Sequence, residues 1–406
     1  MRTLSIKIPN VSESLEQKLE AMILGGAFWP DMPIASERRL ADEFDVSRTS
    51  LRNALASLLE RGLLRQVGKR YHTTNIMADL LAPSLVKVAQ NFPTQLFDYW
   101  IFLFDEAVGL AVRKAQDSDR EMIENAVTNL RQSLLGSHAA DMFSRFEALN
   151  RTVFDGCYNF FLSQTHQALM SVMQPYFVRS FEKLAEDPKA AERLSQAIGL
   201  VMKMEFEPDP IHTALATGFE QSKAKPTNDS VNFGGVNAAQ LVDVVLRNPL
   251  FLEAVYELRL ITERYAALEA AKHVEGSEIK QLVAHLDYMT AIADSSPSQY
   301  SKLDTDLHQL IAECTHNPVF AVINAALSPV FSRTTNQWLK KHMEMRSDQS
   351  TIHLQHTQIV EAVVARDPEK AQVTMDEHLA YVLRNLRHLR QQDQLQEIAI
   401  ARRLLR

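Results

Sequence analysis

The chain has 406 residues, which is too long for one ordinary hydrophobic core and predicts two or three domains. Its 46% hydrophobic and 23% charged residues, with only 12 glycines, are typical of a folded, helix-rich protein rather than a disordered one. It has no apolar run near the roughly 20 residues of a membrane-spanning helix, no signal-peptide core in its first residues, and only two cysteines. These features exclude a secreted, membrane or disulfide-stapled protein and predict a cytoplasmic one.

The net charge of −7 is divided unevenly along the chain. Of the 43 basic and 50 acidic side chains, residues 1–75 hold 11 and 9, which leaves 32 and 41 for the remainder. The head therefore has a balance of +2 and the body a balance of −9. A mildly basic head on an acidic body is compatible with a small nucleic-acid-binding module, but a balance of +2 alone does not establish one. The positions of the charged residues in the head decide whether it can bind nucleic acid.

The head has the pattern of a winged helix-turn-helix. Apolar residues at helical spacing predict three helices, over 12–24, 37–44 and 48–61. Ser47 stands where the N-cap of the third helix is expected, and two short extended segments around the turn Val67–Lys69 follow as a β-wing. This order of elements predicts a DNA-binding domain over residues 1–76.

The third predicted helix begins with guanidinium and hydroxyl groups that suit phosphates and base edges in a major groove. A solvated helix face is the alternative, but the cap, the basic cluster and the wing together favour DNA contact. The stretch SERRLADEFDVSRTSLRNALASLLERGLL, followed by VGKR, resembles the DNA-binding head of GntR-type bacterial regulators, with Asp45 where that family usually has glycine. The charge of Lys69 adds to the wing. The resemblance places DNA-contacting positions at Arg38, Ser47, Arg48, Thr49, Ser50, Arg52 and Gly68.

After the head, nearly every segment has helical periodicity, except for a polar stretch rich in Pro, Gly and Asn. The expected fold class is therefore mostly α, with the winged helix-turn-helix followed by two all-helical bundle domains. The predicted body consists of a first helical domain at 77–221, a linker at 222–237, a second helical domain at 238–390 and a helical tail at 391–406.

An internal repeat relates the two halves of the body. Three positions have counterparts 157 residues later. Glu147, Arg151 and Cys157 correspond in this way to Asp304, His308 and Cys314. At an offset of 158, Ile101 corresponds to Arg259 and Asn159 to Asn317. The pattern Pro-x-Phe-x-Arg at 175–179 also recurs at 329–333. Several matches in the same order predict a duplication, and two unrelated helical domains are the alternative.

The second copy contains a candidate metal site. Asp304 and His308 are four residues apart, on one face of a predicted helix. Two further helices are predicted on either side of Asp367, with His356 11 residues before it and His378 11 residues after it. Positions equidistant from the turn of an antiparallel hairpin lie side by side, so the four side chains can converge as a three-nitrogen, one-oxygen site. Buried histidines that only form hydrogen bonds are the alternative.

The stretch 248–386 resembles the FCD effector domain of the FadR branch of GntR regulators, through the motifs ELRLITE, DTDLHQLIAECTHNP and HTQIVEAVVARDPEKAQVTMDEHL. The resemblance implies a small carboxylic acid effector, an effector-contacting role for Arg259, and a divalent metal. Zinc is the first expectation, with nickel, iron or manganese as alternatives. Asn317 and Arg333 are further ligand candidates, for which a helix cap or a surface salt bridge is equally compatible. The family's metal ligands fall on Asp304, His308, His356 and His378.

The first copy, roughly 90–221, resembles this domain only faintly. Glu147 and Arg151 occupy the positions of the first two ligands. Because a guanidinium repels a cation, no metal is expected here, and Arg151 is expected to pair with Glu147 one turn away. The aromatic and methionine-rich segments 93–104 and 154–178 are interpreted as core or a dimer surface, with an apolar pocket for an acyl ligand as the alternative.

Together these features predict a DNA-binding transcriptional regulator, not an enzyme, whose operator affinity is controlled by a small organic acid at the metal. The expected partners are double-stranded operator DNA, the acid and a second copy of the chain in a homodimer, with no membrane. Packing of the two copies on each other within one chain is a further hypothesis. The alternatives are a metal-free regulator that uses the body for dimerisation or an acyl ligand, and a metal-dependent hydrolase or decarboxylase. The enzyme needs a base, yet Asp306 and Glu313 are poorly placed on the helix of His308.

Overall fold

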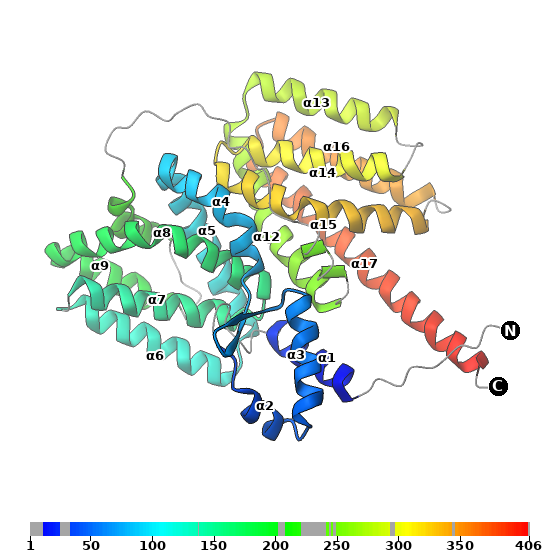
Figure 1. The fold of residues 1–406 in the computed structure, drawn as a ribbon. Helices are drawn as coiled ribbons and strands as arrows, with labels where there is room; N and C mark the ends of the chain where they lie inside the picture. Colours follow the sequence, from blue (N-terminus) through cyan, green and yellow to red (C-terminus); the bar gives the residue numbers. More distant parts are fainter. Residues whose placement is uncertain are drawn as a thin grey trace. The chain divides into compact units, whose positions relative to one another are not determined.

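The described part of the chain is almost entirely helical and contains one small antiparallel sheet (Figure 1). This confirms the predicted fold class of a winged helix-turn-helix followed by helical bundles. The predicted linker at 222–237 lies outside the described residues. The computed structural model describes residues 11–24, 33–136, 138–201, 208–220, 241–242, 245–246, 249–292, 297–342 and 346–404.

The head has the three helices and the wing that its sequence predicts. The Ser47 hydroxyl accepts a hydrogen bond from the Ser50 backbone N–H at 3.0 Å, which caps the third helix. In the turn before it, Asp45 has a φ of 51°, in the left-handed region that aspartate tolerates better than most residues, so the family's usual glycine is not required here. The elements are α1 (Val11–Leu24), α2 (Glu37–Glu43), α3 (Arg48–Glu60), β1 (Leu64–Val67) and β2 (Arg70–Thr73).

The chain forms two compact units, and each unit is assembled from separate stretches of sequence. Unit 1 comprises 1–82, 107–174 and 181–214, and unit 2 comprises 83–106, 175–180 and 215–406. The helices α5 (Pro93–Lys114) and α8 (Phe160–Glu186) each contribute to both units. The domain boundaries predicted from sequence follow the repeat, whereas the units follow the packing of helices that the repeat alone does not reveal.

Unit 1 joins the head to a helical layer. Its remaining helices include α6 (Asp117–Leu134), α7 (Ala139–Gly156), α9 (Pro188–Ile198), α10 (Pro208–Leu215) and the first part of α4 (Ile76–Asn91). The amide of Gln164, buried on α8, binds the chain where it leaves the wing. Its Nε2 donates to the Thr74 carbonyl at 2.9 Å and its Oε1 accepts from the Met77 N–H at 3.1 Å. The exit of the head is thereby fixed on α8.

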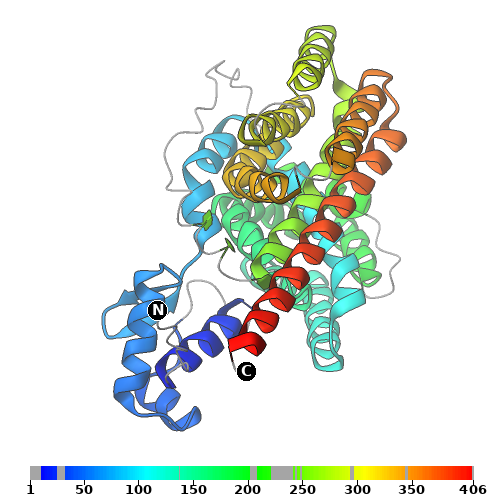
Figure 2. The same ribbon diagram turned by 90° about the vertical axis from the view of Figure 1, so that its right-hand side faces the viewer.

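Unit 2 is a bundle in which α12 packs against α14, α15, α16 and α17. Helices α16 and α17 form an antiparallel hairpin, visible in orange and red in Figure 2. The turn uses Arg366 at a φ of 54°, and the Asp367 carboxylate then accepts from the Lys370 N–H at 3.0 Å. These helices, together with α13, are α12 (Pro249–His273), α13 (Gly276–Ala291), α14 (Pro297–Glu313), α15 (Pro318–His342), α16 (Arg346–Val364) and α17 (Pro368–Leu404).

The aromatic segment 93–104 is packed as core within unit 2. The Phe97 ring stacks on Phe219 with centroids 4.5 Å apart, and Trp100 meets Phe177 edge-on at 4.9 Å. Phe97 and Trp100 are fully buried. Of the interpretations left open by the sequence, this packing agrees with a core for the segment 93–104.

The two copies share local details besides the order of their helices. Asp119 and Glu278 each occupy the third helical position of a capping box, on α6 and α13 respectively. The Tyr158 hydroxyl donates to Asp119 at 2.5 Å, and His316 Nε2 lies 3.0 Å from Glu278. Tyr158 and His316 both adopt left-handed φ angles, 48° and 55°, just before the asparagine that precedes α8 or α15. The same contact at the same place in both copies supports the internal repeat.

Candidate metal centre

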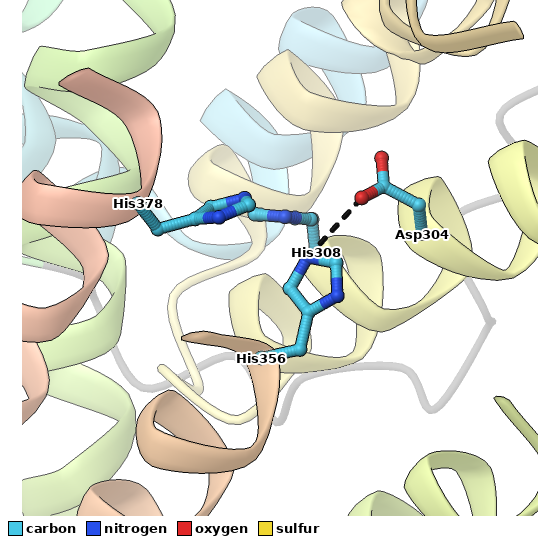
Figure 3. Close-up of side chains that lie close together, drawn as sticks. All are labelled: Asp304, His308, His356 and His378. Atoms are coloured by element: carbon cyan, nitrogen blue, oxygen red, sulfur yellow. Dashed lines mark ion pairs between the residues drawn. The ribbon is translucent and has the colours of Figure 1, made fainter. Parts of the chain in front are cut away.

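Four buried side chains from three helices of unit 2 converge at one point (Figure 3). Asp304 and His308 lie one turn apart on α14, His356 lies on α16 and His378 on α17. Each is at most 3% exposed. One potential ligand atom from each side chain lies within 4.8 Å of those of the other three. The α16–α17 hairpin therefore brings the two distant histidines to the same depth beside the α14 pair.

The donor atoms of this cluster fit a metal ion. The Nε2 atoms of His308 and His378 are buried without a hydrogen-bond partner, whereas buried polar atoms normally have one. His356 Nε2 and Asp304 Oδ1 are 3.1 Å apart. Two ligands that share one ion at about 2.1 Å each are separated by about 3 Å or slightly more. Three imidazole nitrogens and one carboxylate oxygen are a donor set that zinc and other transition metals accept.

Two outer side chains orient the imidazole rings. The Glu263 carboxylate on α12 lies 2.6 Å from His308 Nδ1, and the Gln355 side-chain carbonyl lies 3.1 Å from His378 Nδ1. When Nδ1 of each ring carries the proton, the ring donates outward and its Nε2 lone pair faces the cluster. Histidine ligands of metals are usually held in this way.

Arg259 lies beside the four candidate ligands in a small pocket. The arginine is 1% exposed, its Nε donates to Glu263 Oε1 at 2.9 Å, and its guanidinium carbon lies 4.2 Å from the centre of the Phe331 ring. Its Nη2 is buried without a hydrogen-bond partner. The cavity volume is about 10 Å³, room for about one water molecule. The lining residues are Tyr256, Arg259, Asp304, Thr335, Ile352, His378, Val382 and Leu386.

Burial and pairing together determine the charges of the cluster. Burial would raise the pKa of Asp304, but its hydrogen bond with His356 and the nearby Arg259 hold that pKa well below its usual range. Burial likewise opposes ionisation of Glu263, but Arg259 and His308 together outweigh it and lower the pKa of Glu263. Burial lowers the pKa of His356 and His378. At neutral pH the two carboxylates are therefore ionised and these two imidazoles neutral, which are the states that metal ligands require.

The two weaker ligand candidates lie away from this pocket. Asn317 accepts from the Val319 N–H at 3.0 Å and donates to the Gln95 carbonyl at 2.8 Å, so it acts as a cap and a packing contact. Arg333 is exposed and does not line the pocket. Sequence reasoning missed Glu263, although it stands four residues after Arg259 and therefore on the same face of a helix.

The corresponding positions of the first copy hold a different pair. Glu147 and Arg151 lie one turn apart on α7. Burial raises the pKa of Glu147, and the charge of Arg151 acts in the opposite direction. Among the described residues of the chain, the four-residue cluster of unit 2 is the one group of histidine, cysteine and acidic side chains arranged to hold a metal.

The N-terminus of α3 presents the predicted DNA-contacting side chains. Arg48 and Thr49 are exposed, and the hydroxyls of Ser47 and Ser50 lie 2.9 Å apart at the cap. The Arg52 guanidinium lies 2.8 Å from the Glu37 carboxylate of α2, and this pairing raises the pKa of Arg52. The exposed face of α3 therefore combines an available guanidinium with one held in place by an acid.

The wing and α2 carry the remaining predicted positions. Gly68 joins β1 to β2 with a φ of 62°, a conformation that favours glycine, and Lys69 beside it is exposed. Arg38 lies 3.9 Å from Asp42 on the solvent face of α2. All eight predicted DNA-contacting residues thus belong to the head, within unit 1.

Two known protein families match separate segments of the chain, one near each end. The family described as bacterial regulatory proteins, gntR family, matches residues 11–70, and the FCD domain matches residues 254–381. Its N-terminal segment is thus similar to the gntR family of bacterial regulatory proteins, and its C-terminal segment to the FCD domain. The FCD match includes all four side chains of the cluster, and these two domains are those of transcriptional regulators rather than of enzymes.

Proteins similar to this chain include the HTH-type transcriptional repressor NanR of Cronobacter sakazakii, 34% identical over 131 residues, or 30% of this chain and 50% of that protein. The uncharacterized HTH-type transcriptional regulator YcbG of Bacillus subtilis is 29% identical over 131 residues, 32% of this chain and 52% of that protein. The chain spans about half the length of the curated relatives it matches. E. coli McbR/YncC, a solved structure, matches with a TM-score of 0.27 and 16% identity over 52% of this chain and 93% of that chain. No helix among the described residues is both long and apolar enough to cross a membrane.

Proposed function

We propose that this protein is a transcriptional regulator whose affinity for double-stranded operator DNA is controlled by a small carboxylic acid bound at a metal in the FCD domain. The observation that carries the proposal is the convergence of Asp304, His308, His356 and His378 next to Arg259. A guanidinium with a free Nη2 and a metal-binding cluster, both facing one pocket, suit a ligand that has one carboxylate.

The four side chains would hold the ion, with zinc as the first candidate and nickel, iron or manganese as alternatives. A divalent ion with four protein ligands retains open coordination positions, which a hard carboxylate can fill. Arg259 would fix the orientation of the acid, and Tyr256 and Thr335 in the pocket lining offer hydroxyl groups to the remainder of the molecule. The pocket's small size favours a compact acid or requires that the lining side chains move.

Ligand binding would act through the packing of unit 2. The residues that would hold the metal and the acid come from α12, α14, α16 and α17. Ligands that contact all four helices together stabilise the arrangement of the helices in which every contact is formed. The higher affinity of the ligands for this arrangement than for others is the source of allosteric control. The expected consequence is a change in the affinity of the head for operator DNA.

Whole chains are proposed to associate as homodimers, because each chain has one head and a two-fold symmetric operator presents two half-sites. In the proposed complex α3 lies in the major groove, and the wing carrying Lys69 contacts the phosphate backbone. The mass of the complex on a palindromic site, measured by analytical ultracentrifugation, distinguishes a dimer from a monomer. A monomer that binds a single half-site with full affinity would contradict this part of the proposal.

The metal proposal is tested on protein purified without chelators. We expect one divalent ion per chain by elemental analysis and a thermal shift with some members of a panel of small organic acids. His308→Ala should lose both, whereas His273→Ala, whose side chain is 47% exposed on α12, should keep both. Wild-type protein that contains no metal and takes up none on titration would contradict the metal proposal and favour the metal-free regulator.

The DNA proposal is tested separately with fragments selected from random sequence. Arg48→Ala should weaken binding and reduce the slope of affinity against salt concentration by about 1 if this arginine neutralises a phosphate. Arg113→Ala, on α5 and outside the head, is the control. Equal loss of affinity in both variants would show that the effect does not come from the face of α3.

A further inference from the structure

The first part of α5, residues 93–106, packs within unit 2 on a face formed by α12 and the start of α15. The Phe102 ring stacks on Tyr265 with centroids 4.0 Å apart and an interplanar angle of 21°. Tyr99 meets the edge of Phe320 at 4.8 Å. Tyr99 is fully buried, and Phe102 and Phe320 are 6% and 4% exposed. An aromatic cluster therefore holds α5 against the FCD domain.

Polar contacts border this aromatic cluster on two sides. Arg264 on α12 donates through Nη2 to the Glu106 carboxylate of α5 at 2.5 Å, and its Nη1 lies 3.7 Å from Asp376 on α17. At the other border, the Asn317 side chain donates to the Gln95 carbonyl at 2.8 Å. The side chains of Arg264 and Glu106 are 27% and 19% exposed, so their ion pair is partly shielded from water.

The Glu106–Arg264 pair joins equivalent positions of the internal repeat. The offset of 158 that relates Ile101 to Arg259 also relates Glu106 to Arg264. In an interface with two-fold symmetry, a residue near the axis meets its own counterpart. Here the two counterparts have opposite charges, which two identical copies cannot achieve.

We propose that residues 93–106 are an internal partner for the α12–α15 face of the FCD domain, and that the Glu106–Arg264 pair selects this partner over the same face of a second chain. Pairing two identical α12 faces would place one Arg264 against another, a repulsion between like charges that disfavours this alternative. Association of whole chains must then use a different surface. The inference concerns neither the metal nor DNA, so it stands or fails independently of the proposed function.

The first test uses a zero-length cross-link. In Arg264→Lys, a carbodiimide can join the new amine to Glu106 as an amide with loss of water. Separately prepared ¹⁴N- and ¹⁵N-labelled samples of the variant are mixed, unfolded and refolded together, and the linked peptides are identified by mass spectrometry. We expect the 106–264 link with both peptides of the same isotope, and no link in Arg264→Lys/Glu106→Gln. A link that combines the two isotopes, or the absence of the 106–264 link, would overturn the proposal.

The second test separates charge from shape. Glu106→Gln removes the ion pair but keeps the side-chain size, and Glu106→Arg adds a repulsion against Arg264. We expect the thermal unfolding midpoint to fall from wild type to the glutamine variant and to fall again in the arginine variant. An arginine variant as stable as the glutamine variant would contradict the selection by charge.

Discussion

Helices α7 and α14 correspond to each other in the internal repeat predicted from sequence, but they carry different pairs of side chains one turn apart. The second copy has Asp304 and His308, which face two further histidines, and the first has Glu147 and Arg151. Both copies keep the capping box, the left-handed residue and the contact between them. The contacts that define the bundle are therefore separate from those that would bind an ion, and one can be lost without the other.

The copies also differ in the helices that complete them. The second copy ends in α16 and α17, of 19 and 37 residues, whereas the corresponding part of the first copy has α9 and α10, of 11 and 8 residues. Two of the four candidate ligands come from α16 and α17. The four-residue cluster therefore depends on the long α16–α17 hairpin as much as on Asp304 and His308 of α14.

The largest expected effect is the loss of a ligand from the hairpin. His378→Ala removes one of four donors, so we expect metal affinity to fall by more than the roughly 100-fold that an outer substitution can cost. Competition with a chromophoric chelator measures the affinity, and circular dichroism should show an unchanged helix content. Wild-type affinity in this variant would mean that the cluster does not bind the ion.

A smaller effect is expected from Glu263, which contacts both His308 and Arg259. Glu263→Gln keeps the shape but weakens the orientation of the imidazole, and we expect a loss of metal affinity of about 10- to 100-fold. The response to the organic acid should weaken in the same variant. If metal affinity is unchanged, the carboxylate has no positioning role.

A pH effect should distinguish unit 1. His166 is buried there, stacked on Phe154, and burial lowers its pKa to about 3. Because the folded state excludes a proton that the unfolded chain binds below its ordinary pKa of about 6.5, the associated stability is complete above that pH and is lost as pH falls toward 3. Between pH 7 and pH 5 wild type should lose about 1–2 kcal/mol more than His166→Gln does. Urea unfolding of metal-free protein measures this difference, and equal losses would contradict it.

The smallest expected effect is a deliberate null result. Glu147→Asp combined with Arg151→His copies the α14 pair into the first copy, but the short helices α9 and α10 do not provide the rest of the site. We expect the metal content to stay at one ion per chain by elemental analysis. A second equivalent would show that the ligand pair alone decides where an ion binds.

Much of the fold was predictable because it depends on local signals. The Ser47 cap and the periodicity of the head place each of its helices within one or two residues of the structure. The equal spacing of His356 and His378 from Asp367 was enough to predict that they lie side by side. In both places the relevant geometry is set by residues close in sequence.

The remainder depends on contacts between distant segments. Periodicity identifies the apolar face of α5 but not the helices it meets, so its division between the two units could not be predicted. For Asn317, capping and ligand binding require the same side chain, and only the packed structure places it on Gln95. Glu263 was missed because its function comes from His308, which lies on another helix.

The shared Glu263 carboxylate has a consequence for what the proposed regulator would sense. Because the same group steadies a metal ligand and the arginine that would receive the acid, filling either position improves the other, and the benefit is reciprocal. Lack of the metal ion would then have the same effect on operator binding as lack of the organic acid. The proposed regulator would respond only when both are present, so that transcription depends on the nutrient and the trace element together.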